Sequence, residues 1–311
     1  MKSIATITAL LTAAAAGACC GVGPDGKPVT FGGQTNIVIW NSQTHTEHFI
    51  RNARFETKAL DLGFIAPTPT KPDLASVDPD AFRLLARLQP PPLFPPAEVG
   101  AKAIAGVSVV QRVHVGGYDA TTLLATDANA LADWMQKNGY ATDFAIQDWT
   151  KFYILRHWYL TAFKVENADR VAETGTIRMS FRTEKPFNPY RVPSDNIPMD
   201  GPTPGLHVYF IGDGAYDANI GSQSPWQNAD WNVGVPSETV SLLAKDLKLN
   251  TADLPSNPTV ESFTDPSFPR PVQDDIYFQP APPSKLPLAA AVFALVLIAL
   301  AIRSRLRPAR T

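Results

Sequence analysis

Four consecutive residues, His45, Thr46, Glu47 and His48, form the pattern in this sequence that comes nearest to a metal-binding motif. In an extended strand, successive side chains point to opposite faces, so His45 and Glu47 would face one way and His48 the other. Zinc proteases instead carry His-Glu-x-x-His on a helix, where both histidines share one face. We therefore expect an exposed polar hairpin here and no metal site.

A second set of oxygen ligands, Asp213, Asp217 and Asn219, lies in a segment that also contains glycines. Such oxygens suit Ca²⁺, but the alternating Asp-x-Asp-x-Asp-Gly register and the closing Glu of an EF-hand are missing. We therefore expect a turn in which the Asp and Asn side chains bond to the backbone. No metal ion and no other cofactor is predicted.

Motifs of nucleophilic catalysis are missing as well, since the sequence contains neither Gly-x-Ser-x-Gly nor Ser-x-x-Lys. Three histidines, His114, His157 and His207, lie in or beside expected strands. Only the tertiary structure could bring one of them to a carboxylate and a nucleophile, so no catalytic residue is assigned. We favour a module without enzymatic activity. The alternative is a hydrolase of the cell envelope.

The aromatic residues Trp226 and Trp231, with Tyr216 upstream, are the candidate binding surface in this sequence. Aromatic ring faces can bind sugars and peptides. The competing interpretation is that these rings pack in the core beneath a long loop, because exposed aromatic patches are uncommon in soluble domains.

Both ends of the chain carry apolar segments. The first is too short to span a bilayer and ends in small residues, which predicts a signal peptide at 1–18 cleaved between Ala18 and Cys19. The second, at 286–302, is uncharged and long enough for a transmembrane helix, and the arginine-rich tail at 303–311 would stay in the cytoplasm. We therefore expect a single-pass protein of the cell membrane with its body outside the cytoplasm. Whether this anchor is retained or processed stays open.

The chain has two cysteines, Cys19 and Cys20, and they are adjacent. Neighbouring Cα atoms lie ~3.8 Å apart, less than the usual ~4.4 Å minimum for a disulfide. Three interpretations stay open: free thiols or a strained local disulfide, lipidation of Cys19 although Ala16 stands where a branched residue is preferred, and a redox or metal role.

The charge distribution argues against nucleic-acid binding. Without Lys2 and the four tail arginines, 22 Lys and Arg stand against 29 Asp and Glu. No cluster of basic residues occurs in this acidic body, and nucleic acids require one.

Periodicity predicts an α+β body with antiparallel or mixed sheets, a few short helices and the C-terminal transmembrane helix. Strands at 34–40 and 47–57 should form a hairpin, and a third strand at 60–66, stopped by Pro67, should complete an N-terminal meander. The remaining expected elements are helices at 80–88, 127–138 and 146–155 and strands at 107–115, 157–165, 174–182 and 206–211.

The helix at 127–138 has the clearest pattern, because Leu131, Trp134 and Met135 form one apolar stripe. Asp127, or Thr126 before it, can cap the start, and Gly139 suits a left-handed C-terminal cap. We expect the stripe to pack on the sheet that contains the strand at 157–165.

Clusters of proline divide the chain. The body should occupy 19–252, as one domain or as two subdomains joined near 89–104, and a proline-rich stalk at 253–285 should hold it away from the membrane.

Three segments resemble a known family: Val115 to Asp119 (VGGYD), the stretch at 123–140 (LLATDANALADWMQKNGY) and Trp158 to Val165 (WYLTAFKV). The N-terminal strands and the segment GFIAPTP at 63–69 agree as well. Together they resemble the uncharacterised bacterial family called domain of unknown function 2330, over most of the region from Cys19 to about Gly212. The resemblance implies an exported or envelope-associated bacterial protein and transfers no catalytic residue. We expect a binding or structural module of the envelope, with the membrane and an envelope protein or glycan as partners.

Overall fold

The computed structural model describes residues 20–22, 31–55, 63–90, 109–140, 142–165, 175–194, 205–221, 224–266 and 274–282. The chain divides into two units, Met1–Gln279 and Pro280–Thr311. The first unit contains the α+β fold described below, and its sheets are mostly antiparallel.

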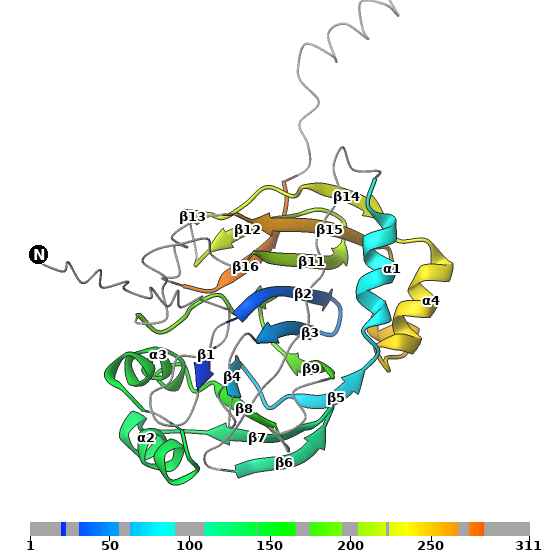
Figure 1. Cartoon of the computed structure of the whole chain (residues 1–311). Coiled ribbons are helices and arrows are strands. Elements are labelled where there is room, and N and C mark those ends of the chain that lie inside the picture. Colours follow the sequence, from blue (N-terminus) through cyan, green and yellow to red (C-terminus); the bar gives the residue numbers. More distant parts are fainter. Residues whose placement is uncertain are drawn as a thin grey trace, which may run out of the picture. The chain divides into compact units, whose positions relative to one another are not determined.

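Within the described residues, the strands form three sheets (Figure 1). The large sheet has the order β14 (Trp231–Gly234), β15 (Pro258–Asp265), β11 (Leu206–Asp213), β2 (Phe31–Asn41), β3 (Thr46–Phe55), β9 (Thr176–Arg182), β5 (Asp73–Val77). The middle sheet has the order β1 (Cys20–Val22), β4 (Gly63–Thr68), β8 (Tyr159–Val165), β7 (Tyr118–Leu124), β6 (Val109–Val115). The small sheet has the order β10 (Phe187–Asn188), β16 (Ile276–Pro280), β12 (Tyr216–Ile220), β13 (Ser224–Pro225).

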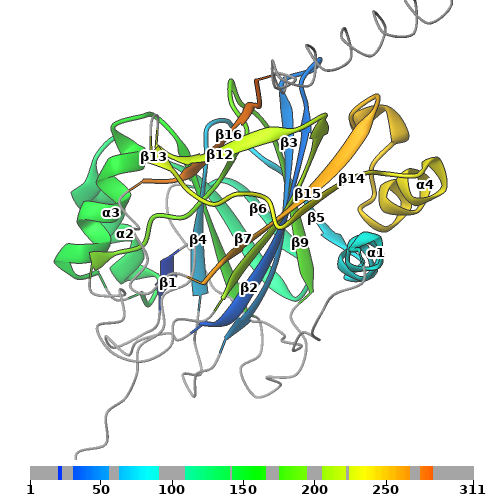
Figure 2. The same cartoon turned by 90° about the horizontal axis from the view of Figure 1, so that it is seen from above.

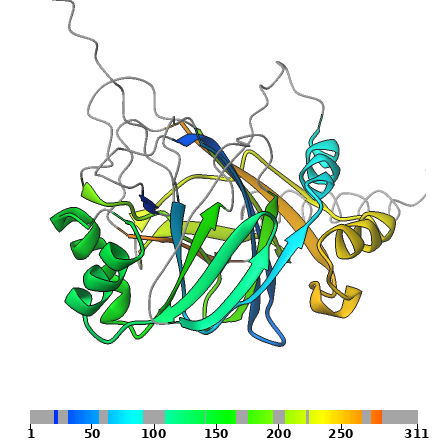
Figure 3. The same ribbon diagram turned by 60° about the horizontal axis from the view of Figure 1, so that its bottom comes forward.

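Two pairs of helices cover the outer faces of the sheets. Helices α1 (Asp80–Leu88) and α4 (Ser237–Asp246) pack on the large sheet, and α2 (Ala128–Lys137) and α3 (Phe144–Ile154) pack on the middle sheet. Figure 2 shows the two pairs on opposite sides with the strands between them. Figure 3 shows the same separation with the middle sheet facing the viewer.

Strand alternation explains why the large sheet has a core on each face. In β2, Val38 and Trp40 face the middle and small sheets, whereas Ile37 and Ile39 face α1 and α4. A third cluster of apolar side chains, which includes Leu160, lies between the middle sheet and the helix pair of α2 and α3. Sheets buried on both faces favour long apolar runs, which residues 37–40 of β2 and 208–211 of β11 supply, whereas β3 also carries the buried polar residues Glu47, His48 and Arg51.

Most predicted elements are confirmed with small shifts at their ends. The hairpin at 34–57 is β2 and β3, and the helices expected at 80–88, 127–138 and 146–155 are α1, α2 and α3. The strands expected at 107–115, 157–165, 174–182 and 206–211 are β6, β8, β9 and β11.

The predicted N-terminal meander is wrong. Strand β4 belongs to the middle sheet, whereas β2 and β3 belong to the large sheet. Pro67 also does not stop β4, which continues to Thr68 opposite Tyr159. On its other side β4 pairs with β1 only as far as Ile65. Pro67 lies beyond the last residue of β4 that pairs with β1. Its missing N–H therefore costs the β1–β4 pair no hydrogen bond among the described residues.

The body also extends past residue 252, where the stalk was expected. β15 lies inside the large sheet between β11 and β14, and its Val260 and Phe263 are buried. Here the prolines flank strands: Pro258 is the first residue of β15, and Pro266 follows its last.

Two other expectations fall outside the described residues: the segment at 91–104, where a joint between subdomains was expected, and the membrane span at 286–302. In the part of the chain that the structure describes, no helix has the length and apolar character to cross a membrane.

Candidate functional site

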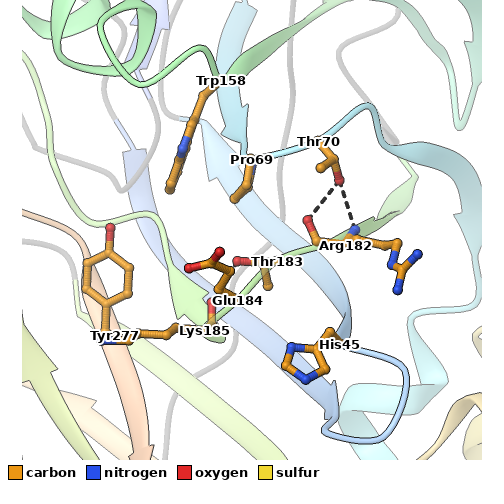
Figure 4. A pocket seen from close by; sticks show the side chains of 9 residues that line it. All are labelled: His45, Pro69, Thr70, Trp158, Arg182, Thr183, Glu184, Lys185 and Tyr277. Carbon is orange, nitrogen blue, oxygen red and sulfur yellow. Dashed lines mark hydrogen bonds between the residues drawn. The ribbon is translucent and has the colours of Figure 1, made fainter.

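A cavity of ≈ 560 Å³ lies at the end of the large sheet where the β2–β3 turn, the β4–β5 turn and the end of β9 meet (Figure 4). Its lining consists of His45, Pro69, Thr70, Trp158, Arg182, Thr183, Glu184, Lys185 and Tyr277. These residues come from five separate stretches of the chain. We call this cavity the rim cavity.

Two half-buried aromatic side chains, Trp158 and Tyr277, line one part of the rim cavity. Both rings contact the buried Phe187, with ring centroids 4.9 Å from Trp158 and 6.0 Å from Tyr277. Trp158 also packs on Tyr153 of α3, at 5.6 Å. The core therefore fixes the two rings while leaving part of each exposed.

Phe187 is itself held by the buried carboxyl group of Glu47. Its backbone N–H donates to Oε2 of Glu47 at 2.9 Å. Burial raises the pKa of Glu47 well above its usual value, and the hydrogen bond from Phe187 opposes that rise. Burial likewise raises the pKa of Tyr277. Its phenol is protonated at neutral pH, as that of an ordinary tyrosine is, and can donate a hydrogen bond.

Short hydrogen bonds tie the segments of the rim cavity together. The N–H of Thr183 donates to the carbonyl of His45 at 3.0 Å. The hydroxyl of Thr70 donates to the carbonyl of Arg182 at 2.8 Å and accepts from its N–H at 2.9 Å. The backbone under the charged side chains is therefore organised before any ligand arrives.

The charged lining residues Arg182, Glu184 and Lys185 are exposed. None of the three forms an ion pair with a residue that the structure describes. His45 lies on the other side of the β2–β3 turn, with a left-handed φ of 52° and its ring edge-on to Trp40 at 5.7 Å. Aromatic faces beside unpaired polar groups suit a ligand with an apolar face and a polar edge.

The expectation of an exposed polar hairpin at 45–48 is wrong for two of its residues. His45 is exposed, but Glu47 is 0% and His48 4% exposed. They face opposite sides of the large sheet as alternation predicts, because Glu47 reaches Phe187 whereas Nδ1 of His48 lies 2.8 Å from Oγ of Ser180. Burial lowers the pKa of His48 to about 4, so it is neutral at neutral pH.

The turn expected at 212–219 is confirmed only between Asp213 and Tyr216, and the expected hydrogen bonds of Asp and Asn side chains to the turn's own backbone are not found among the described residues. Asp213 accepts hydrogen bonds from Oγ of Ser42 at 3.0 Å and from the N–H of Asn257 at 3.1 Å, and Gly214 supplies a φ of +94°. Asp217 and Asn219 lie on β12. Across the described ranges, no group of three His, Cys, Asp or Glu side chains could hold a metal ion.

His207 lies near a serine and a carboxylate, but in an arrangement unlike that of a hydrolase. Nε2 of His207 lies 2.8 Å from Oγ of Ser262, which also lies 3.4 Å from Oδ2 of Asp230. The serine is therefore between the other two groups, whereas a catalytic triad has the histidine in the middle. Ser262 is 1% exposed, and burial lowers the pKa of His207.

The other two histidines are exposed. His157 follows α3 with a left-handed φ of 56°. His114 lies directly opposite Asp119 on β7, which lies opposite Lys164 on β8, so the three share one face of the middle sheet. All three line a second cavity, of ≈ 290 Å³, beside Trp134.

The aromatic residues proposed from the sequence do not form one surface. Trp226 is half-buried and packs on Tyr190 and Phe263, between the large and small sheets. Trp231 packs on Tyr209 on the opposite face of the large sheet, and Tyr216 is buried. The processing residues Ala18 and Cys19 lie outside the described residues.

Sequence reasoning missed the rim cavity because Trp158 and Tyr277 lie far apart in the chain. The signals in the sequence are local. One is the aromatic residue Trp158 just before β8, and the other is the charged stretch Arg182 to Lys185 at the end of β9. Nothing in the sequence links these signals to one another.

Layered sheets between two helical pairs, with an aromatic cavity at one end, define an α+β protein of mostly antiparallel type. Residues 13–214 match the family described as "Uncharacterized protein conserved in bacteria (DUF2330)", and the chain belongs to this family. No curated protein matches the sequence. Among solved structures, the crystal structure of baculovirus P35 is similar with a TM-score of 0.33 and 9% identity, covering 67% of this chain and 75% of that one.

Proposed function

We propose that this protein is a membrane-anchored binding module of the bacterial cell envelope, and that the rim cavity binds a saccharide of that envelope. The aromatic pair Trp158 and Tyr277, fixed on Phe187, carries the proposal. The sequence supports the location, because a leader at 1–18 and an apolar run at 286–302 would export the body and hold it at the membrane.

A saccharide fits the chemistry of this lining. A sugar ring presents C–H groups on its faces and hydroxyls around its edge, so it can lie on an aromatic ring while polar residues bond its rim. Trp158 and Tyr277 supply the ring faces, and Glu184 supplies an exposed carboxylate that can accept from hydroxyls. A cavity of ≈ 560 Å³ is in the size range of ligand sites.

The proposal is tested by titrating the protein with chitotetraose, a soluble neutral saccharide of envelope-type sugars, in a calorimeter. Trp158→Ala should weaken binding by about 2 kcal/mol, and Tyr277→Ala by about 1 kcal/mol, because each removes one stacking surface. Trp231→Ala is the matched control, since this half-buried tryptophan lies on the far face of the large sheet.

Two outcomes would count against the rim cavity. Wild-type protein that shows no heat with chitotetraose or with peptide-free peptidoglycan strands would overturn the proposal. If Trp231→Ala abolished binding while Trp158→Ala did not, the ligand would bind at the surface first expected from the sequence.

A second candidate function, hydrolysis of an envelope polymer, draws on the row formed by His114, Asp119 and Lys164 in the second cavity. A histidine beside a carboxylate could act as a general base. The same titration separates the two functions, because chromatography of the recovered saccharide would show shortened chains only if the protein hydrolyses it.

A further inference from the structure

We infer that the saccharide bound in the rim cavity carries an acidic group, a carboxylate or a phosphate, and that Arg182 recognises that group. This inference rests on the proposed function and narrows its ligand class. Three observations carry it: the charge of the lining, the fixed backbone of Arg182, and the place of Arg182 across the cavity from Tyr277.

The lining is basic although the body is acidic. Arg182 and Lys185 stand against the single carboxylate Glu184, whereas 29 Asp and Glu exceed 27 Lys and Arg in the whole chain. An excess of positive charge at a cavity on an acidic protein attracts anionic ligands and raises their rate of association.

Arg182 differs from Arg178, which precedes it on the same strand. The guanidinium of Arg178 is buried, pairs with Asp73 at 2.8 Å and donates to the carbonyl of Leu247 at 2.7 Å, so it serves the fold. The guanidinium of Arg182 is exposed and makes no hydrogen bond or ion pair with any described side chain. Among the described residues, Arg182 is held through its backbone, by Thr70 and by the pairing of β9 with β3.

A fixed backbone, with a guanidinium that pairs with no described residue, suits the recognition of an anion. Arginine presents a planar fork of N–H donors that matches the two oxygens of a carboxylate or a phosphate. Because Thr70 already orders the backbone, less conformational entropy is lost when the fork binds.

The rim cavity separates the two kinds of contact. In Figure 4, Tyr277 lies at one side, Arg182 at the other, and Glu184 between them. A sugar ring on the aromatic side would have to extend its acidic substituent past Glu184 to reach Arg182. Lys185 adds positive charge to the cavity without the fork geometry.

The inference is tested with pairs of saccharides that differ only in the acidic group. Peptide-free peptidoglycan tetrasaccharide carries lactyl carboxylates that chitotetraose lacks, and 6-phosphochitobiose carries a phosphate that chitobiose lacks. Wild-type protein should bind at least one acidic member about tenfold more tightly than its neutral partner, the factor that one charge-assisted hydrogen bond supplies. The difference should shrink at high salt.

Arg182→Gln should remove this preference, so that the variant binds each acidic member no more tightly than its neutral partner. Lys185→Gln should reduce the preference by a smaller factor. Arg87→Gln, an exposed arginine of α1 outside the cavity, is the matched control, and thermal melts confirm that each variant is folded.

The outcomes distinguish the inference from the function on which it rests. Equal binding of acidic and neutral members by wild type would overturn the inference and keep the saccharide site. A preference that survives Arg182→Gln would also overturn it. Binding of no saccharide at all would overturn the proposed function itself.

Discussion

At the scale of single residues, the buried side chain of Asp275 joins separate segments of this protein. Asp275 is 0% exposed and accepts from the hydroxyl of Tyr153 at 3.0 Å and from the N–H groups of Tyr190 and Arg191 at 2.8 and 3.2 Å. It therefore connects α3 to the segment after β10 and to the start of β16. Burial raises the pKa of Asp275 to about 6, although these hydrogen bonds oppose the rise.

The raised pKa of Asp275 predicts a pH dependence of stability. The folded state keeps a proton on this carboxyl up to about pH 6, whereas the unfolded chain loses it near pH 4. The contribution of Asp275 is therefore fully present at low pH and is lost as pH rises from about 4 to about 6, by roughly 3 kcal/mol. Asp275→Asn cannot ionise, so its free energy of unfolding should rise relative to wild type across this window.

Denaturant titrations at several pH values measure this difference. Asp275→Ala is the companion variant: it removes the acceptor that the three donors share and should cost about 3 kcal/mol below pH 4. Because alanine cannot titrate, this cost should shrink as pH rises from about 4 to about 6 and the wild type loses stability. Parallel stability curves for wild type and Asp275→Asn would show that Asp275 does not titrate in this range.

At the scale of a single element, capping residues determine where helix α2 begins and ends. The side chain of Asp127 accepts from the N–H of Ala130 at 2.8 Å, and Gly139 has a φ of +84°, as the sequence predicted for the two caps. The three residues of the apolar stripe are not equally buried. Leu131 and Met135 are each 1% exposed, but Trp134 is half-buried and lines the second cavity.

Substitutions in this stripe should rank by burial. Leu131→Ala should lower the free energy of unfolding by about 3 kcal/mol because it leaves a cavity against the middle sheet. Trp134→Ala should cost about 2 kcal/mol, less than a fully buried tryptophan, because part of its ring already contacts water. Thermal and denaturant melts measure both.

The exposed Lys137 supplies the control, since its alanine variant should change stability by less than about 0.5 kcal/mol. A loss with Trp134→Ala as large as that expected for Leu131→Ala would mean that the indole contributes more packing than its exposure indicates.

Two strands beyond residue 252, β15 and β16, belong to the sheets of the body. β15 lies between β11 and β14 in the large sheet, and β16 lies between β10 and β12 in the small sheet, where it carries Tyr277 into the rim cavity. A body truncated at residue 252 would therefore lose an internal strand of the large sheet and the part of the cavity that Tyr277 lines. Binding experiments need a chain that extends at least to Gln279, the end of the first unit.

The proposed topology predicts how proteases reach the protein in cells. If residues 286–302 span the membrane with the tail in the cytoplasm, protease added to intact spheroplasts should digest the body and spare the tail. A body protected until the membrane is lysed would contradict this orientation. Mass spectrometry of the mature C-terminus then distinguishes a retained anchor from a cleaved one.

The sequence by itself determined the individual elements, because periodicity, caps and turns depend on residues close together in the chain. The hairpin of β2 and β3, the caps of α2 and the opposite faces of Glu47 and His48 all follow from such local rules. Only the tertiary structure decided which sheet each strand joins and which distant side chains meet. The assignment of β4 to the middle sheet and the contact of Trp158 and Tyr277 with Phe187 depend on packing between segments that no local pattern links. For that reason the candidate site emerged from the fold and not from a motif.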